Sequence, residues 1–496
     1  MNKFVNAMQN ENNYTYTENG ALALKSTNSS IVDLFGTIGS LRTRNDGEIE
    51  RLFAKAFAED ALLATKMSFY ARNIRGGLGE RRTPKVIWKY LAQSRPDVVR
   101  KNLVYIPQFG RWDDLFVFEG TPVEADMWDL IKSQFQADLK VLAAGKGSMS
   151  LMPKWLKSVN ASNKDTIRLA KKTARTLGLS DKEYRQKLSA MRAYLDVVEV
   201  KMSAQEWDKI KYAGVTSRAM KLYRNAFSNH DAMGFEAYKE SLVKGETKVN
   251  ASTLFPYDIM ETYGLRESGG WRDSYLQMSK PYDVILEEQW KALPNYVEGE
   301  NNVLVMADTS GSMSGRPLAS AVGLAMYFAE RNKGAFKDVF LTFSNNPKFV
   351  TLKGNSLYDK VKSVEAIVAN TDIERAFKLI LDTAVKNNVP AEDMPKSLVI
   401  ISDMEFDSQT TGNHNLYYDR MVEMYHNAGY EVPTIIFWNV DSRQDTFHVA
   451  CDKKGVQLAS GQSASTFKTI MANIGKTPLE AVIATLNSET YSMITV

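Results

Sequence analysis

Apolar residues in the first half of the chain recur at helical spacing. In the stretch 48–74 they fall near a period of 3.6 residues, beginning at Leu52, Phe53, Ala56 and Phe57. Further amphipathic runs of this kind follow, joined by short links, to about residue 259. Such a series favours an α-solenoid of helix pairs, and the lack of a strict period indicates a divergent array.

Several of these helices carry start signals. Thr83 precedes a proline, which is typical of a cap followed by the first helical turn. Ser180 and Ser203 each stand three residues before a glutamate, the spacing of a capping box. We therefore expect helices to begin at these three positions.

After residue 301 short β-branched runs alternate with helices. Strands are predicted at 303–308, 339–344, 397–403 and 433–440, a weaker one at 455–461, and an edge strand at 348–354. The predicted helices between them are 317–332, 372–387 and 414–429. Near-continuous apolar strands joined by helices indicate a doubly wound parallel sheet covered on both faces.

This change of pattern divides the chain into four parts. We expect an N-terminal arm at 1–30, a helical-repeat domain at 31–259, a linker region at 260–300 and an α/β domain at 301–496. A length of 496 residues agrees with two or more domains. No apolar window is long enough for a membrane span, and the start lacks a signal-peptide core. Cys451 is the single cysteine, so a cytoplasmic location without an internal disulfide is expected.

The basic residues are unevenly distributed. Lysine and arginine number 44 against 37 acidic residues over 1–300, but 18 against 21 over 301–496. The densest basic stretch, 151–250, has 20 against 11. This surplus indicates a polyanionic partner for the helical half, although a solvated surface would give the same counts.

Oxygen-bearing side chains gather where the predicted strands end. Asp308, Ser310 and Ser312 follow the first strand, Asp403 ends the third, and Thr371 precedes a helix on the same edge. Ligands of a doubly wound sheet bind at the carboxyl ends of its strands. Two carboxylates and three hydroxyls are the donors that Mg²⁺, Mn²⁺ or Ca²⁺ prefers, whereas zinc would call for cysteine or histidine. In the alternative interpretation, the serines and Asp308 only cap the helix near Pro317.

These residues resemble the metal-ion-dependent adhesion site (MIDAS) of von Willebrand factor A domains. The resemblance implies direct metal contacts from Ser310, Ser312 and Thr371, and contacts partly through water from Asp308 and Asp403. It also implies that an acidic side chain of a protein partner completes the metal's ligands. No general base accompanies the site, so we expect no enzymatic activity.

A second motif lies in the helical half. Residues 69–82 read Phe-Tyr-Ala-Arg-Asn-Ile-Arg-Gly-Gly-Leu-Gly-Glu-Arg-Arg, with the segments 106–115, 152–156 and 207–212 further on. They resemble the Ro autoantigen (TROVE) superfamily, and more closely a related, largely uncharacterised subgroup with the same layout. The resemblance implies a ring of HEAT-like helical repeats followed by a von Willebrand A-type, Rossmann-like domain.

The same resemblance implies that the chain binds small structured or misfolded RNA in a ribonucleoprotein. The signature supplies Arg72, Arg75, Arg81 and Arg82 as candidate contacts. Local basicity alone adds the candidates Lys154, Lys157, Arg168, Lys171, Lys172, Arg175 and Arg218. Two alternatives stay open: the Arg-Gly-Gly segment fixes a turn between helices, or the protein is a metal-dependent assembly scaffold with no RNA role. The oligomeric state is not indicated.

Overall fold

The computed structural model describes residues 12–268, 275–297, 302–343, 347–364, 372–408 and 416–496. Helices dominate as far as residue 291, as the apolar spacing predicts. Their bounds are α2 (Ser30–Thr37), α3 (Asp46–Glu59), α4 (Ala61–Arg72), α5 (Arg82–Ser94), α6 (Pro96–Asn102), α7 (Ile106–Phe109), α8 (Glu124–Ala144), α9 (Met152–Trp155), α10 (Lys164–Thr176), α11 (Asp181–Tyr194), α12 (Val198–Ser203), α13 (Ser217–His230), α14 (Ala232–Val243), α15 (Pro256–Tyr263) and α16 (Val284–Lys291).

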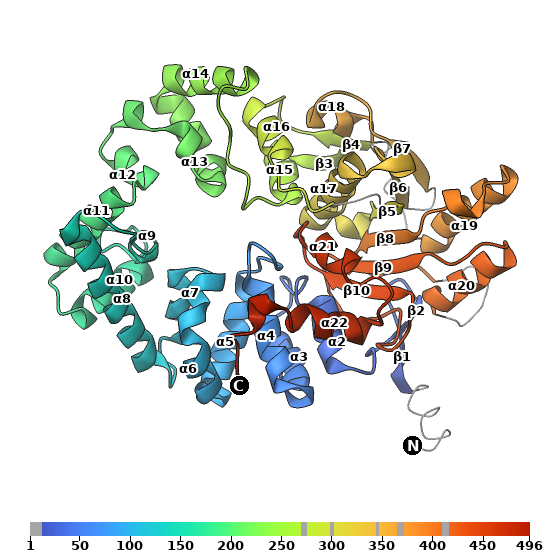
Figure 1. Ribbon diagram of the computed structural model, residues 1–496, viewed down its shortest axis with the longest axis horizontal. Helices are drawn as coiled ribbons and strands as arrows, with labels where there is room; N and C mark the ends of the chain where they lie inside the picture. Colours follow the sequence, from blue (N-terminus) through green and yellow to red (C-terminus); the bar gives the residue numbers. More distant parts are fainter. Residues whose placement is uncertain (1–11, 269–274, 298–301, 344–346, 365–371, 409–415) are drawn as a thin grey trace.

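These helices follow an open arc (Figure 1). One end of the arc meets the C-terminal part where α2 packs against β10 (Val456–Ser460) and α22 (Pro478–Leu486). The other end meets it where α15 packs along α17 (Arg316–Arg331). The architecture is therefore a ring of helices that the α/β part completes. Two short antiparallel ladders lie outside the main sheet, β1 (Tyr14–Tyr16) with β2 (Leu22–Leu24) and β3 (Leu265–Ser268) with β4 (Tyr275–Met278).

The predicted doubly wound sheet is confirmed. Its order is β10-β9-β8-β5-β6-β7, with parallel neighbours except for β7 at one edge. The remaining bounds are β5 (Val303–Asp308), β6 (Val339–Phe343), β7 (Lys348–Thr351), α18 (Leu357–Lys362), α19 (Ile373–Lys386), β8 (Ser397–Ser402), α20 (Tyr417–Asn427), β9 (Thr434–Asn439) and α21 (Thr466–Met471). Alternate residues of β5 face opposite layers: Val305 packs on the α17 side, and Met306 on the side of α19 and α20. Both faces are thus buried, which explains the near-continuous apolar strands.

Three predicted helix boundaries differ from the structure. The stretch 48–74 is two helices rather than one, because Asp60 ends α3 and accepts a hydrogen bond from the Leu63 backbone to begin α4. Thr83 lies inside the first turn of α5 and caps nothing. Ser203 ends α12 instead of starting a helix. The capping box at Ser180 is present.

A segment near each end of the chain packs into the part of the molecule that is formed mainly by the other half of the sequence. Near the N-terminus, Ala21 is buried in the core formed by β8, α19 and α20. Near the C-terminus, Val482, Leu486 and Ile494 are buried in the core of the helical part. Each part is therefore held by a segment from the far end of the sequence.

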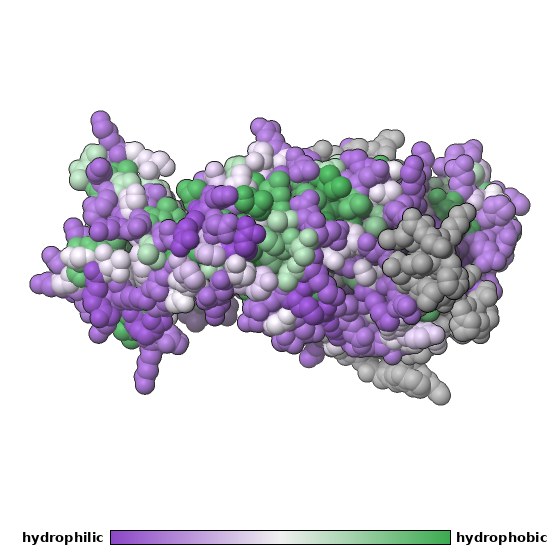
Figure 2. Space-filling view, turned by 90° about the horizontal axis from the view of Figure 1, so that it is seen from below, coloured by the Kyte–Doolittle hydropathy of each residue, from purple (hydrophilic) through white to green (hydrophobic). Residues whose placement is uncertain are grey.

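One face of the molecule is mostly polar. Figure 2 shows one face covered largely by hydrophilic residues, with apolar residues gathered near its middle. Within the described ranges, no helix is both long enough and apolar enough to pass through a membrane.

Candidate metal site and cationic groove

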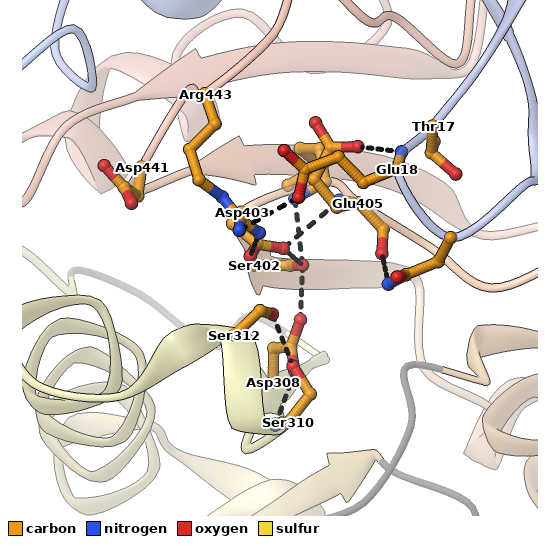
Figure 3. Close-up of polar contacts among 12 residues, drawn as sticks. Thr17, Glu18, Asp308, Ser310, Ser312, Ser402, Asp403, Glu405, Asp441 and Arg443 are labelled. Carbon is orange, nitrogen blue, oxygen red and sulfur yellow. Dashed lines mark hydrogen bonds and ion pairs between the residues drawn. The ribbon is translucent and has the colours of Figure 1, made fainter. Parts of the chain in front are cut away.

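Asp308 lies at the carboxyl end of the central strand β5 and is fully buried. Its Oδ1 accepts a hydrogen bond of 2.9 Å from the Ser310 backbone, and its Oδ2 accepts one of 2.5 Å from the Ser402 hydroxyl at the end of β8 (Figure 3). Two adjacent strand ends thus fix this carboxylate. The pKa of Asp308 is raised, first by burial and then by the charge of Asp403.

The two predicted serines lie together. The Ser310 and Ser312 hydroxyl oxygens are 3.1 Å apart, on a single 3-10 turn that follows β5. Ser310 is buried, whereas Ser312 is exposed. Helix α17 begins after Gly315 and has no side-chain cap. The interpretation of these residues as helix caps is therefore wrong.

Asp403 follows β8 on the same edge of the sheet and is buried. Its Oδ1 accepts a 3.2 Å hydrogen bond from the Glu405 backbone, and its Oδ2 is paired with the Arg443 guanidinium. The next residue, Met404, has φ of +67°, so the chain turns sharply directly after the carboxylate. Thr371, the fifth predicted ligand, lies outside the described residues.

Acidic groups outnumber basic ones at this edge. Figure 3 draws the carboxyl groups of Glu18, Asp308, Asp403, Glu405 and Asp441, with Arg443 against them. Burial raises the pKa of Glu405 and of Asp441, with the charge of Asp403 as a further contribution. Five carboxyl groups face one guanidinium, so a cation would favour their ionised forms and balance the charge that they would then carry. The donors fit a hard divalent ion.

The candidate metal site would bind its cation through serine hydroxyl oxygens as well as through carboxylates. Among the described residues, no group of three histidine, cysteine, aspartate or glutamate side chains has the arrangement of a metal site. A site of two aspartates and serine hydroxyls does not contain such a group.

The sequence interpretation missed four residues of this edge: Ser402, Glu405, Arg443 and Glu18. The rule that ligands gather at strand ends could have found the first three, because Ser402 ends β8 and the loops after β8 and β9 carry Glu405 and Arg443. Glu18 had no such signal. It reaches the site because its backbone donates a 2.7 Å hydrogen bond to the Glu405 carboxylate, 387 residues away in sequence.

The Arg-Gly-Gly segment forms a tight turn between α4 and α5. A Cβ atom on Gly77 would lie 2.1 Å from the Tyr70 carbonyl oxygen, and Gly79 has φ of +67°. The Asn73 side chain accepts hydrogen bonds from the backbones of Arg75 and Gly76. The turn itself thus explains two of the three glycines.

Arg72 is not placed to reach a ligand in solvent. Its side chain is 2% exposed, and its Nε donates a 2.7 Å hydrogen bond to the Asp114 carboxylate. Lys85 contacts the other Asp114 oxygen at 2.9 Å. The expectation that Arg72 contacts RNA is therefore wrong, because this residue joins α4 to the segment after α7.

Most other predicted RNA contacts are paired with acidic side chains. Arg82 is paired with Asp46, Lys157 with Asp113, Arg168 with Glu119, Lys171 with Asp181, Lys172 with Glu119 and Glu124, and Arg218 with Asp258. Within the described part of the chain, Arg75, Arg81, Lys154 and Arg175 have no acidic partner. The candidates therefore form two groups: cations already paired with an acidic side chain, and cations without such a pair among the described residues.

Helices α3 and α5 enclose a groove of about 580 Å³. Its lining residues are Asp46, Glu50, Arg81, Arg82, Lys85, Val86, Lys89, Tyr90, Gln93 and Val117. Arg81, Lys85 and Lys89 are four residues apart, so they form one stripe along α5, rising about 6 Å from one to the next. Partial burial, followed by the charges of Arg218 and Arg111, lowers the pKa of Arg81. A cation among like charges attracts an anion.

The class of protein is therefore a ring of helices closed by a doubly wound α/β domain, with an Asp-x-Ser-x-Ser loop at the carboxyl edge of its sheet. The chain belongs to the family described as "Domain of unknown function (DUF2828)", whose model matches residues 17–117 and 127–301. Residues 302–490 match a second model, described as "Domain of unknown function (DUF7788)".

Two known proteins are similar along most of the chain. "Uncharacterized protein L728" of Acanthamoeba polyphaga mimivirus is 27% identical over 499 residues, which cover 92% of this chain and 85% of the relative. The crystal structure of Deinococcus radiodurans RO (RSR) protein matches with a TM-score of 0.44 and 14% identity, covering 89% of this chain and 99% of that one.

Proposed function

We propose that this protein binds RNA through the groove between α3 and α5, and that its α/β part holds a divalent cation, with Mg²⁺ as the first choice and Mn²⁺ or Ca²⁺ as alternatives. The observation that carries the RNA proposal is Arg81. Its guanidinium has no acidic partner among the described residues, and its pKa is lowered by partial burial and then by the charges of neighbouring arginines. Phosphates of a polyanion would relieve that repulsion.

The groove offers more than charge. Lys89 is a second exposed cation without an acidic partner in the described residues, two turns of α5 beyond Arg81. Tyr90 lines the same groove and offers an aromatic face for a base. Asp46 and Glu50 form the facing wall and would repel phosphates there. The strand is therefore expected to follow α5 rather than α3.

The salt dependence of RNA binding tests this proposal. We would titrate the full-length protein with a labelled single-stranded RNA at several salt concentrations, comparing wild type with Arg81→Gln/Lys89→Gln. Each lost phosphate contact should reduce the steepness of log K against log salt by about 0.7. The slope for the double variant should therefore be shallower than that of wild type by about 1.4. Lys140→Gln is the matched control, since Lys140 is also exposed and is not a candidate RNA contact, but lies on α8. Equal slopes for wild type and double variant would exclude the groove.

Metal binding is tested separately. Asp308, Ser310, Ser312 and Asp403 would hold the cation, which would supply a positive centre for an oxygen ligand. Mg²⁺ should raise the melting temperature of the wild type, and EDTA should reverse the rise. Asp308→Ala should abolish this response while the variant still unfolds cooperatively. A wild type that melts at the same temperature with Mg²⁺ and with EDTA would refute the metal site.

A second function is favoured by one observation. Ser312 is exposed while Asp308 is buried, so the candidate metal site is open to solvent on its hydroxyl side. An acidic side chain of a protein partner could approach from there. In a metal-dependent assembly scaffold, pull-down of protein partners would require Mg²⁺, and RNA affinity would be weak and indifferent to the Arg81→Gln/Lys89→Gln change.

A further inference from the structure

The loop after β9 brings an internal cation to the candidate metal site. Arg443 Nη2 is paired with Oδ2 of Asp403, and its Nη1 lies 3.0 Å from Oε2 of Glu18 (Figure 3). The guanidinium thus bridges a buried carboxylate, 1% exposed, and a carboxylate at the surface, 37% exposed. A ligand of the proposed metal and a solvent-facing acid share one arginine.

This arginine is held incompletely. Its Nε is buried and has no hydrogen-bond partner among the described residues, and its side chain remains 30% exposed. The loop around it is anchored independently: the Ser442 backbone donates to the Ser40 carbonyl at 3.0 Å, and Asp445 is paired with Arg44. The side chain can therefore move while its backbone stays in place.

Hydrogen bonds of the neighbouring residues hold Glu18 in place. It lies on the turn between β1 and β2, where the Thr17 hydroxyl donates to the Phe406 carbonyl at 2.6 Å and the Asn19 amide donates to the Glu405 carbonyl at 2.6 Å. The turn is thus bound to the segment directly after Asp403. The carboxylate of Glu18 stays beside Arg443 whether or not Asp403 is engaged elsewhere.

We infer that Arg443 competes with the divalent cation for Asp403, and that Glu18 receives the guanidinium when the cation binds. In the closed state Arg443 neutralises Asp403, as the structure has it. In the metal-bound state the cation takes over that role, and Arg443 pairs with Glu18 alone, so no charge is left buried without a partner. This inference rests on the metal site proposed above and adds a built-in control of its affinity.

The test measures Mn²⁺ and Mg²⁺ affinity by calorimetry on the full chain. Arg443→Gln removes the competing charge and should tighten binding at least roughly tenfold, because a unit charge a few ångströms away at an effective dielectric near 20 is worth more than that factor. Glu18→Gln removes the receiving carboxylate and should weaken binding. Arg443→Lys keeps the charge but lacks the two-pronged guanidinium, so the affinity should fall between those of wild type and Arg443→Gln. Arg51→Gln is the matched control, since Arg51 pairs with Asp445 away from Asp403.

A double variant separates competition from a general field effect. If Glu18 acts by receiving Arg443, the Glu18→Gln change should have little effect in an Arg443→Gln background. Additive effects of the two changes would overturn the inference, as would affinities unchanged by either one. Metal binding by none of the variants would instead refute the metal site itself. Thermal unfolding in EDTA checks that each variant is folded.

Discussion

Replacing Arg72 by methionine tests whether this arginine is a structural cation. The buried Arg72 and Asp114 side chains are 2% and 1% exposed, and join α4 to the segment following α7. Burial alone would raise the pKa of Asp114, yet the charges of Arg72 and Lys85 outweigh it and hold that pKa below its ordinary value. Methionine keeps most of the aliphatic stem of arginine, so the change removes chiefly the charge and its hydrogen bond.

The expected loss in the free energy of unfolding depends on the contacts that Asp114 keeps in the variant. Breaking a buried ion pair from one side costs about 3–5 kcal/mol, because the other charge stays buried. Lys85 at 2.9 Å and the Arg111 backbone at 2.9 Å still contact the carboxylate. We therefore expect a loss near the lower end, about 3 kcal/mol.

Urea unfolding of the full-length protein, followed by tryptophan fluorescence, measures this loss as a shift in the transition of the helical part. Arg82→Met is the control: its pair with Asp46 is exposed on both sides, so the loss should stay below about 1 kcal/mol. Adding Asp114→Asn to Arg72→Met should recover part of the stability, because the unpaired charge disappears. A loss under about 1 kcal/mol for Arg72→Met, together with weaker RNA binding, would refute the structural role.

Three further predictions concern other parts of the molecule. Burial lowers the pKa of His448 to about 4, so in the folded state it stays neutral while the unfolded chain gains a proton below about pH 6.5. The stability advantage of wild type over His448→Gln should therefore shrink by up to about 3 kcal/mol between pH 6.5 and 4, measured by urea unfolding, and a constant difference would exclude this. Glu119→Gln frees Arg168 from its pair and should tighten RNA binding by roughly threefold if Arg168 reaches the RNA, whereas unchanged binding would remove it from the interface. Gly77→Ala should lower the melting temperature by several degrees, because its Cβ has no space in the turn, and a change within error would contradict that geometry.

The sequence was sufficient for features that depend on local pattern. The positions of the buried strands follow from short apolar runs, since a sheet buried on both faces demands them. The break at Asp60 was missed because the apolar period continues across it, and only the hydrogen bond to the Leu63 backbone separates the helices.

Features that depend on distant partners could not be predicted. The charge of Arg72 is satisfied by a residue 42 positions away, so its sequence neighbours suggest a surface cation. Arg443 belongs to a loop whose conformation is set by contacts with the helical part, such as that between Ser442 and Ser40. The candidate metal ligands were easier to place, because the ends of adjacent parallel strands meet by topology alone.

The candidate metal site depends on the whole chain rather than on the α/β part alone. Its edge is bounded by Glu18 from the N-terminal hairpin, and the loop carrying Arg443 is anchored by Asp445 to Arg44 of the helical part. The C-terminal segment is also joined to the helical part, because the Asn73 amide of the Arg-Gly-Gly turn donates a 3.1 Å hydrogen bond to the Tyr491 hydroxyl. A fragment spanning 302–490 would lose all of these contacts, and with them the carboxylate that balances Arg443. Metal affinity measured on such a fragment would therefore describe a different electrostatic environment from that of the complete ring.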